Sequence, residues 1–290
     1  MSHLFCFGFG FTARRLATTL RAAGWSVSAT ARSEEKCAAL KAEGVECQMF
    51  DGTAPLLDQS ALEGATHILL SAPPGEAGDP VLNLHRHDLA AMKSLKWIGY
   101  LSATSVYGDT GGALVDENAP LRATTTRGLR RIESEEAWLN CVSTIGLSAH
   151  VFRLAGIYGP GRSAIDQLRA GRARRIIKEG HLFSRIHVDD IVSVLEASIK
   201  RPRPGSIYNV CDDEAAMSST VVEYAAELLD IKPPPAIPFD GAPLSDMARS
   251  FYADNRRIDN SLIKSALGVK LAYPDYRAGL KAILAETADS

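Results

Sequence analysis

The sequence lacks the features that mark several specialised classes of protein. Its 290 residues carry 32 lysines and arginines against 34 acidic residues, a formal net charge of −2. A nucleic-acid binder needs a basic face to neutralise phosphates, and this balance argues against one. No apolar run approaches the ~18 residues that a membrane-spanning helix requires. We therefore expect a globular protein of ordinary composition, with a small molecule as its partner and with neither a nucleic acid nor a membrane.

Cysteine is scarce as well, and its spacing is irregular. The five cysteines are odd in number, and none stands in C-x-x-C spacing: Cys6, Cys37, Cys47, Cys141 and Cys211. This pattern indicates neither a disulfide framework nor a metal site, and a reducing cytoplasm is the expected location. The apolar segment from Leu4 to Phe11 has no basic flank before it and is interrupted by glycines, so we expect a buried strand there rather than a signal peptide.

Strand and helix patterns alternate through the first half of the chain. Apolar runs predict strands at residues 4–7, 25–30, 46–50, 67–71, 98–102 and 149–154. Helical periodicity predicts helices at residues 12–23, 34–43, 83–95 and 127–141. Each crossover helix must pack on the sheet, so the alternation predicts an α/β protein with a Rossmann-type, doubly wound parallel sheet.

The pattern changes after Gly161. Helices are predicted at residues 165–170, 190–199, 218–229, 261–267 and 276–284, with one strand at 206–210. The run 232–243 carries five prolines and is predicted to be a connecting loop. We assign residues 1–160 plus 184–212 to the Rossmann domain, and residues 161–183 plus 213–290 to a smaller C-terminal substrate lobe.

A glycine-rich turn follows the first predicted strand and opens the first predicted helix. It has the G-x-G-x-x-G/A arrangement in the context that this motif requires, Gly8-Phe9-Gly10-Phe11-Thr12-Ala13. Gly8 permits the tight turn, Gly10 lets the backbone approach a pyrophosphate, and Ala13 lets the helix lie close to the sheet. The helix start at Phe11 and Thr12 offers N–H groups and a positive dipole to phosphates. The motif predicts dinucleotide binding; a plain strand-to-helix turn is the alternative.

Arg32 stands where a dinucleotide-binding unit distinguishes its two nicotinamide cofactors. NAD sites carry an acid ~20 residues past the glycines, which holds the ribose hydroxyls. Here Arg32 and Ser33 follow the second predicted strand, and no acid appears before Glu34. A guanidinium, with the hydroxyls of Ser33 and Thr30 nearby, suits a 2′-phosphate. We therefore expect NADP in preference to NAD; a solvated arginine at a helix start is the alternative.

Two further segments end predicted strands on the same edge of the sheet. Asp51 follows the third strand, and Ser71, Ala72 and Pro73 follow the fourth. The carboxyl ends of parallel strands meet at the ligand crevice, so these residues are expected beside the adenine and the riboses of the cofactor. Each is equally compatible with a turn.

Four more motifs follow in order along the chain: Ser105-Val106-Tyr107-Gly108, Arg153-Leu154-Ala155-Gly156-Ile157-Tyr158-Gly159-Pro160-Gly161, Ile186-His187-Val188-Asp189-Asp190-Ile191 and Tyr208-Asn209-Val210. Together with the glycine loop, this set resembles the extended short-chain dehydrogenase/reductases, the NAD-dependent epimerase/dehydratase family. The resemblance covers about the first 215 residues. It implies a Rossmann-type domain with a small C-terminal substrate lobe, and the tail looks like that of an atypical branch.

The residues that this family uses for proton transfer are replaced. The resemblance places its Tyr-x-x-x-Lys pair on Arg127 and Arg131, and its Ser/Thr partner on Ala103. A guanidinium stays protonated near neutral pH, so it is neither an acid nor a base there. We name Tyr107 as the candidate acid, with Thr104 beside it and with Arg131 to stabilise a phenolate. Packing of Tyr107 in its turn is the alternative.

Two hypotheses follow. The first is an atypical NAD(P)-dependent oxidoreductase or epimerase-like enzyme that acts on a small polar metabolite. The second is a non-catalytic NADP-binding sensor or regulatory protein, because the Tyr-x-x-x-Lys pair is missing. Nucleotide-sugar members of the family tend to carry an arginine four residues before the histidine of the His-Val-Asp motif, where this chain has Phe183. Diphosphate-sugar substrates are therefore disfavoured, and the sequence is compatible with an oligomer.

Overall fold

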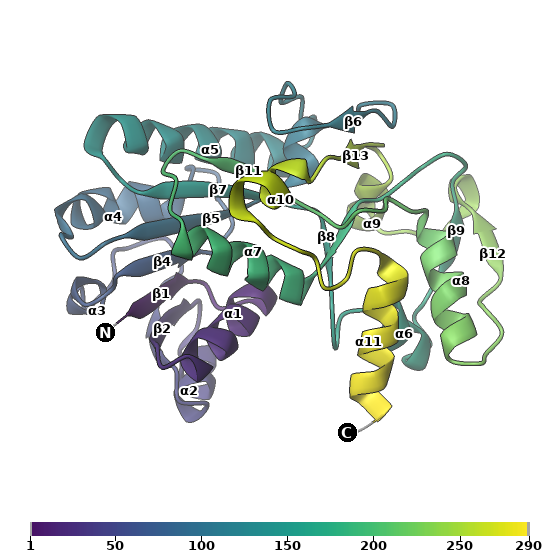
Figure 1. Ribbon diagram of the computed structural model, residues 1–290, viewed down its shortest axis with the longest axis horizontal. Coiled ribbons are helices and arrows are strands. Elements are labelled where there is room, and N and C mark those ends of the chain that lie inside the picture. Colours follow the sequence, from purple (N-terminus) through teal and green to yellow (C-terminus); the bar gives the residue numbers. More distant parts are fainter. Residues whose placement is uncertain (1, 289–290) are drawn as a thin grey trace. The chain divides into compact units, whose positions relative to one another are not determined.

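A computed structural model describes residues 2–288 of the chain (Figure 1). Contacts divide the chain into two compact units. Unit 1 comprises Met1–Ala103, Thr125–Arg153 and Val194–Tyr208; unit 2 comprises Thr104–Thr124, Leu154–Ser193 and Asn209–Ser290. These units follow contacts, whereas the domain boundaries given above follow the pattern of the sequence and stay a prediction. Within residues 2–288, no helix is long and apolar enough to cross a membrane.

The main sheet has seven parallel strands in the order β11-β7-β5-β4-β1-β2-β3, which confirms the predicted fold class. The strands are β1 (His3–Phe7), β2 (Ser26–Ala31), β3 (Glu46–Met49), β4 (His67–Leu70), β5 (Trp97–Ala103), β7 (Ala149–Leu154) and β11 (Ile207–Val210). The strand order reverses direction between β1 and β4, because Phe5 of β1 pairs with Ser28 of β2 on one side and with Ile68 of β4 on the other. The crevice at such a reversal is where open α/β sheets bind ligands.

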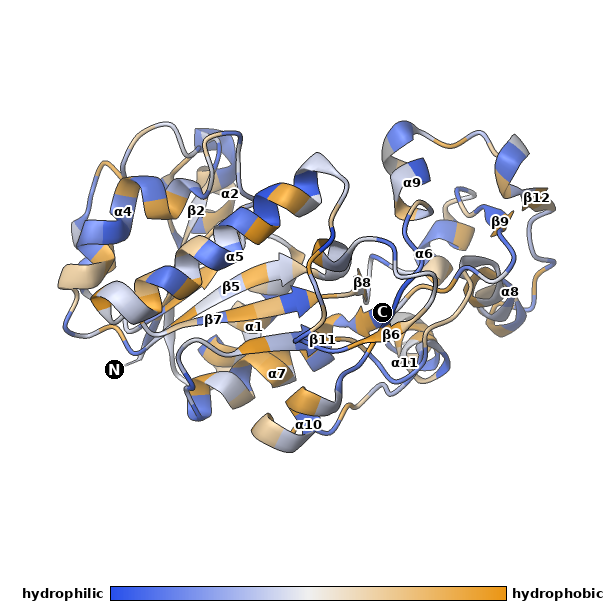
Figure 2. Cartoon of the chain, turned by 90° about the horizontal axis from the view of Figure 1, so that it is seen from above, coloured by the Kyte–Doolittle hydropathy of each residue, from blue (hydrophilic) through white to orange (hydrophobic). Residues whose placement is uncertain are grey.

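Helices cover both faces of this sheet. They are α1 (Phe11–Ala22), α2 (Glu34–Ala42), α3 (Ser60–Glu63), α4 (Pro80–Ala91), α5 (Thr126–Ile145) and α7 (Val188–Lys200). Figure 1 shows α4 and α5 above the sheet and α1, α2 and α7 below it. Figure 2 shows hydrophobic and hydrophilic residues alternating along α5, the pattern of a helix with one face on a core.

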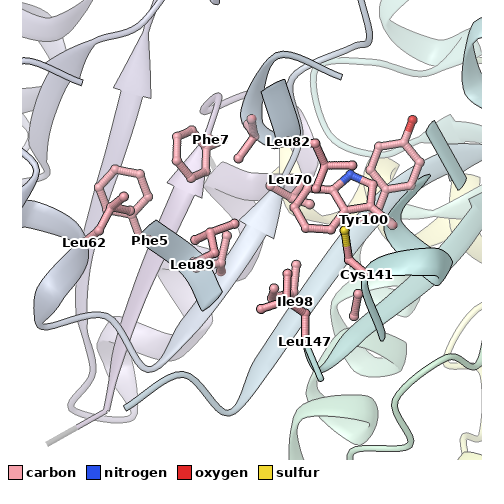
Figure 3. Close-up of a cluster of buried hydrophobic side chains, with 14 of the residues drawn as sticks. Phe5, Phe7, Leu62, Leu70, Leu82, Leu89, Ile98, Tyr100, Cys141 and Leu147 are labelled. Atoms are coloured by element: carbon pink, nitrogen blue, oxygen red, sulfur yellow. The ribbon is translucent and has the colours of Figure 1, made fainter. Parts of the chain in front are cut away.

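One hydrophobic cluster of unit 1 includes residues from the strands of the sheet and from the helices α4 and α5. Phe5, Phe7, Leu70 and Tyr100 come from the strands and are almost wholly buried (Figure 3). The strand segments are buried on both faces, which is why they appear in the sequence as continuous apolar runs rather than as alternating patterns.

Unit 2 contains three short parallel strand pairs and five helices among its described residues. The pairs are β8 (Gly156–Tyr158) with β10 (Arg185–His187), β9 (Arg175–Ile177) with β12 (Ala236–Pro238), and β6 (Leu114–Val115) with β13 (Arg257–Ile258). The helices are α6 (Ala164–Arg169), α8 (Ser218–Leu228), α9 (Asp246–Phe251), α10 (Ser261–Leu267) and α11 (Tyr276–Ala288), with 3-10 turns η1 (Thr104–Tyr107) and η2 (Phe239–Gly241). Tyr158, Ile165, Ala225 and Leu280 belong to its hydrophobic core.

The structure corrects several of the predicted elements. The proline-rich run 232–243 contains β12 and η2, and is therefore more than a loop. Proline is compatible with β12 because both strands of a two-stranded pair are edge strands, where proline is found. Helix α9 and the short strands of unit 2 were not predicted, since elements of two to six residues are too short to show a period.

One ion pair is buried inside unit 1. The guanidinium of Arg153 on β7 donates from Nη2 and Nε to Glu135 Oε2 on α5, at 2.8 and 3.0 Å. The hydroxyl of Ser102 donates to the other carboxylate oxygen. Both charged side chains are almost wholly buried, and removal of either partner leaves a charge in a site from which water is excluded.

We predict that Arg153→Ala lowers the free energy of unfolding by about 3–5 kcal/mol, because it leaves the Glu135 carboxylate buried without its guanidinium. Urea denaturation measures the change. Arg130→Ala is the matched control: Arg130 pairs with Glu76, whose side chain is 92% exposed, and exposed ion pairs contribute little. Equal unfolding midpoints for the two variants would contradict the prediction.

Candidate dinucleotide-binding site

Gly8 forms the turn between β1 and α1 in a conformation that favours glycine. Its φ is +83°, and a Cβ at this position would lie 3.1 Å from the backbone nitrogen of Ala72. The N–H of Gly8 donates to Thr30 Oγ1 at 2.9 Å. Glycine is therefore required at position 8 for two reasons: its backbone angle is left-handed, and the chain after β4 comes too close for a side chain.

The ends of β1, β2 and β4 are tied together around this turn. The N–H groups of Ser71 and Ala72 both donate to the carbonyl oxygen of Phe7 at 2.9 Å. Thr30 is 1% exposed and its hydroxyl supports Gly8 from β2. Four of the predicted cofactor residues are thus brought together: Gly8, Thr30, Ser71 and Ala72.

Gly10 has a different reason to be glycine. Its φ of −86° and ψ of −166° are open to other residues, and the nearest atom to a built Cβ is Ser71 Oγ at 3.8 Å. The protein itself therefore leaves room for a side chain at Gly10. A glycine that the fold does not require is expected where a ligand must approach the backbone, as the pyrophosphate of a dinucleotide does.

Helix α1 presents an N-terminus suited to an anion. Gly10 is its N-cap and contributes no side-chain hydrogen bond, and its first turn has no acidic residue. Thr12 and Ala13 are buried, so the small side chain of Ala13 lets the helix pack closely on the sheet, while Phe11 is half-buried. The dipole of this helix favours phosphate at its start, and these residues fit the dinucleotide that the motif predicts.

Arg32 and Ser33 stand between β2 and α2. Arg32 is exposed and forms no ion pair or hydrogen bond within the described part of the chain. Ser33 is the N-cap of α2, and its hydroxyl accepts from the N–H of Lys36 at 3.4 Å. A free guanidinium next to a helix start is the arrangement that binds a phosphate group well.

Asp51 lies in a turn after β3, and Pro73 lies in the segment after β4. Asp51 Oδ1 accepts from the N–H of Thr53 at 2.9 Å and from its hydroxyl at 2.7 Å. The hydrogen bond from the Thr53 backbone, with that from its hydroxyl, holds the pKa of Asp51 below its usual value. Asp51 is thus ionised at neutral pH and stabilises its own turn, and Pro73 is exposed. Contact of either with a cofactor stays a prediction.

The two positions that the family resemblance gives to the Tyr-x-x-x-Lys pair carry guanidinium groups on α5. Arg127 is exposed in the first turn of the helix, and Arg131 is half-buried. Arg131 Nη1 donates to the carbonyl oxygen of Leu101 on β5 at 2.8 Å. This bond fixes the Arg131 guanidinium against β5, where it can bind an oxyanion or a hydroxyl but cannot accept a proton.

Tyr107 and Thr104 belong to η1 in unit 2, and both are buried. The hydroxyl of Tyr107 donates to Asn209 Oδ1 at 2.7 Å, and the N–H of Asn209 donates to Glu117 Oε1 at 2.8 Å. Sequence reasoning did not identify Asn209 as the partner of Tyr107. The available signal was an amide side chain in a buried apolar strand, which must find a partner. A catalytic role for Tyr107, Thr104 and Arg131 stays a prediction.

Comparison with known proteins agrees with this geometry. The sequence pattern of the NAD dependent epimerase/dehydratase family matches residues 8–211. The chain belongs to this family. The match begins at Gly8 and ends just after β11. It includes the glycine turn, six of the seven strands of the sheet (β1 precedes it) and the motifs that carried the resemblance.

Relatives of the chain extend over nearly its whole length. A solved structure of a functionally unknown conserved protein from Silicibacter pomeroyi DSS is 48% identical, covers 99% of both chains and has a TM-score of 0.89. Protein YeeZ of Escherichia coli strain K12 is 28% identical over 281 residues, covering 92% of this chain and 95% of its own. MoeE5, solved with UDP-glucose and NAD, has a TM-score of 0.79 over 100% of this chain and 99% of its own; at 22% identity it shares the fold.

One relative has a reaction in its name. The 3-diazoavenalumate denitrifying reductase of a Streptomyces species is 29% identical over 186 residues, which is 59% of this chain and 59% of its own.

We predict that Gly10→Leu weakens dinucleotide binding at least about 100-fold, or about 3 kcal/mol, because the new side chain fills the space above the loop. Calorimetric titration with the cofactor measures the affinity. The unfolding transition should move little, since the backbone at Gly10 is unstrained. Gly64→Leu is the matched control: its φ of −84° is ordinary and a Cβ there meets nothing within 4 Å. Unchanged affinity in Gly10→Leu would show that the site lies elsewhere.

Proposed function

We propose that the protein is an NADP(H)-dependent oxidoreductase of an atypical short-chain type, which acts on a small polar metabolite. The observation that carries this proposal is the turn at Gly8 and Gly10. Gly8 is required by the fold, whereas Gly10 leaves room that the fold does not use, directly at the uncapped N-terminus of α1. A pyrophosphate fills such a space and is stabilised by the helix start.

The choice of NADP rests on the charge at the end of β2. Arg32 is exposed there without an internal partner, and Ser33 caps the helix that follows. A 2′-phosphate gains charge-assisted hydrogen bonds from a guanidinium, and no carboxylate at this position repels it. NAD has uncharged ribose hydroxyls in place of the 2′-phosphate, so it offers Arg32 no negative charge to bind.

The choice of an oxidoreductase rests on the cofactor and on one relative. When bound, the nicotinamide supplies or accepts a hydride. The relative that is named a denitrifying reductase supports reduction as the reaction. The chain must then provide a proton donor for the reduced atom, and Arg127 and Arg131 are unsuitable because a guanidinium does not release its proton near neutral pH.

Tyr107 is the proton donor that we propose. Its hydroxyl already acts as a donor, to Asn209 Oδ1, and it would transfer its proton to a substrate oxygen that takes the place of this acceptor. Thr104, three residues earlier on η1, would orient the substrate by a hydrogen bond. As predicted from the sequence, Arg131 would stabilise the phenolate that Tyr107 becomes when it gives up its proton.

A second candidate function is a dinucleotide-binding sensor without catalysis. Two observations favour it. The positions that the family resemblance gives to the catalytic pair carry guanidinium groups, at Arg127 and Arg131. The Tyr107 side chain is fully buried, and its hydroxyl is bound to Asn209. A sensor needs the cofactor site and a change in the protein on binding, and it has no need of an acid.

We predict that NADPH binds more tightly than NADH, and that Arg32→Ala narrows the difference about 10- to 100-fold by loss of the charged hydrogen bonds. Calorimetric titration of each protein with NADPH and with NADH measures the two affinities. Arg86→Ala, which removes another exposed arginine of unit 1, should leave both affinities unchanged. Equal affinities of the unmodified protein for NADPH and NADH would refute the assignment of Arg32.

We predict that Tyr107→Phe lowers turnover ~100-fold or more, because general acid catalysis is lost, while the affinity for NADPH is unchanged. The assay follows oxidation of the reduced nicotinamide against a panel of small polar carbonyl compounds. Tyr208→Phe is the control, since Tyr208 is equally buried and its hydroxyl has no hydrogen-bond partner in the structure. Full activity of Tyr107→Phe excludes this residue from the mechanism, and tight binding without turnover across the panel favours the sensor.

A further inference from the structure

A buried histidine packs behind two of the segments to which we assign the dinucleotide. His85 lies on α4 and is 0% exposed. The centroid of its ring is 5.7 Å from that of the Phe7 ring and 5.6 Å from that of the Phe50 ring. Phe7 directly precedes Gly8, and Phe50 directly precedes Asp51. The imidazole is therefore in contact with the last residue before the glycine turn and with the last residue before the segment that follows β3.

Both ring nitrogens of His85 are hydrogen-bonded. Nε2 accepts from the N–H of Leu56 at 3.2 Å, and Nδ1 lies 2.8 Å from Asp88 Oδ2. A ring nitrogen that accepts an N–H carries no proton itself, so these are the contacts of a neutral ring that donates from Nδ1 to Asp88. Asp88 thus orients the ring, and the lone pair of Nε2 faces Leu56.

The chain leaves the sheet after β3, and residues 51–57 are held on α4 at two points. The first is Gly52, whose φ is +87° and where a Cβ would lie 2.8 Å from the Cβ of Pro80 at the start of the helix. The second is Leu56, which is 3% exposed and donates to His85. Because a buried N–H needs an acceptor, the imidazole fixes where this segment lies.

We propose that His85 is a positioning residue of the dinucleotide site, and that its imidazole holds residues 51–57 beside the adenine end of the cofactor. This role rests on the proposed function and on the expectation that Asp51 lies beside the adenine and the riboses. The adenine is common to NADP and NAD, whereas the 2′-phosphate that we assign to Arg32 is present in NADP alone. Loss of the imidazole therefore weakens the binding of both cofactors and leaves the ratio of their affinities unchanged.

Two substitutions separate the hydrogen bond from the space that the ring fills. His85→Leu places an apolar side chain of similar volume in the site and leaves the N–H of Leu56 without its acceptor. His85→Gln keeps an acceptor, because the glutamine amide reaches the place of Nε2.

His150→Leu is the matched control. His150 is 0% exposed in the same unit, and its Nε2 accepts from the N–H of Arg203 at 2.8 Å. The same kind of bond is therefore lost in this variant. His150 is the second residue of β7, so it lies at the end of the strands opposite to the ligand crevice.

Amide hydrogen exchange of the full-length protein without cofactor tests the anchoring. In His85→Leu we expect the amides of residues 51–57 to exchange at least about tenfold faster, because the buried bond of Leu56 is lost. In His85→Gln and in His150→Leu this segment should exchange as it does in the unmodified protein. Unchanged exchange in His85→Leu means that the ring does not hold the segment, and overturns the proposal.

Calorimetric titration with NADPH and with NADH tests the effect on the site. We expect His85→Leu to bind both cofactors about tenfold more weakly, because the segment is then in the binding position in only a fraction of the molecules. His85→Gln should restore both affinities, and His150→Leu should change neither. Affinities of His85→Leu equal to those of the unmodified protein overturn the proposal. An equal loss in His150→Leu also overturns it, since the cause is then general destabilisation.

The outcomes distinguish this role from the proposed function. If the unmodified protein binds neither cofactor, the proposed function fails, and hydrogen exchange still decides whether the ring holds residues 51–57. If the unmodified protein binds NADPH and His85→Leu binds it equally well, only the role of His85 fails. If His85→Leu does not fold, His85→Asn takes its place with the same expected results, because the shorter amide stays near Asp88 and does not reach Leu56.

Discussion

The turn from β1 into α1 lies so close to the chain after β4 that the site depends on one backbone contact. At Gly8 a methyl group would meet the backbone of Ala72, and the left-handed φ adds to the constraint. This contact brings the start of α1 to the point where the strand order reverses. The hydrogen bonds from Ser71 and Ala72 to Phe7, and from Gly8 to Thr30, hold the same three strand ends together. The position of this helix start, which suits an anion, is therefore set by the geometry of the sheet.

The two positions that the family resemblance gives to the Tyr-x-x-x-Lys pair carry arginines in this chain, Arg127 and Arg131. A lysine and a tyrosine can share and exchange a proton, because the pKa of each responds to its neighbour and to burial. The guanidinium groups of Arg127 and Arg131 stay charged, and Arg131 is tied to Leu101. Position 131 therefore offers a fixed positive charge and directional donors. Such a group favours binding of an oxyanion over proton exchange.

Two helices of unit 1, α5 and α2, differ in how their side chains hold them to the sheet. The ion pair of Glu135 and Arg153, with Ser102, connects α5 to β5 and β7 in the middle of the sheet. Helix α2, beside the last strand of the sheet, has two buried residues, Cys37 and Leu40. Buried polar contacts therefore hold the helix that bears Arg131 to the sheet, whereas few buried side chains hold the helix that begins after Ser33.

The sequence by itself determined the parallel sheet and the glycine turn. Strands buried on both faces must be continuously apolar, and the G-x-G-x-x-A spacing follows from local backbone geometry, so both are visible in a short window of residues. The replacement of the Tyr-x-x-x-Lys pair by Arg127 and Arg131 was inferred from the same sequence and stays a prediction. Only the tertiary structure decided that Thr30 supports Gly8 and that Tyr107 donates to Asn209 across 102 residues. Pairs of this kind depend on which segments the fold brings together. The short strands of unit 2 escaped prediction for the same reason, because a strand such as Ala236–Pro238 exists through its partner at Arg175–Ile177 rather than through its own pattern.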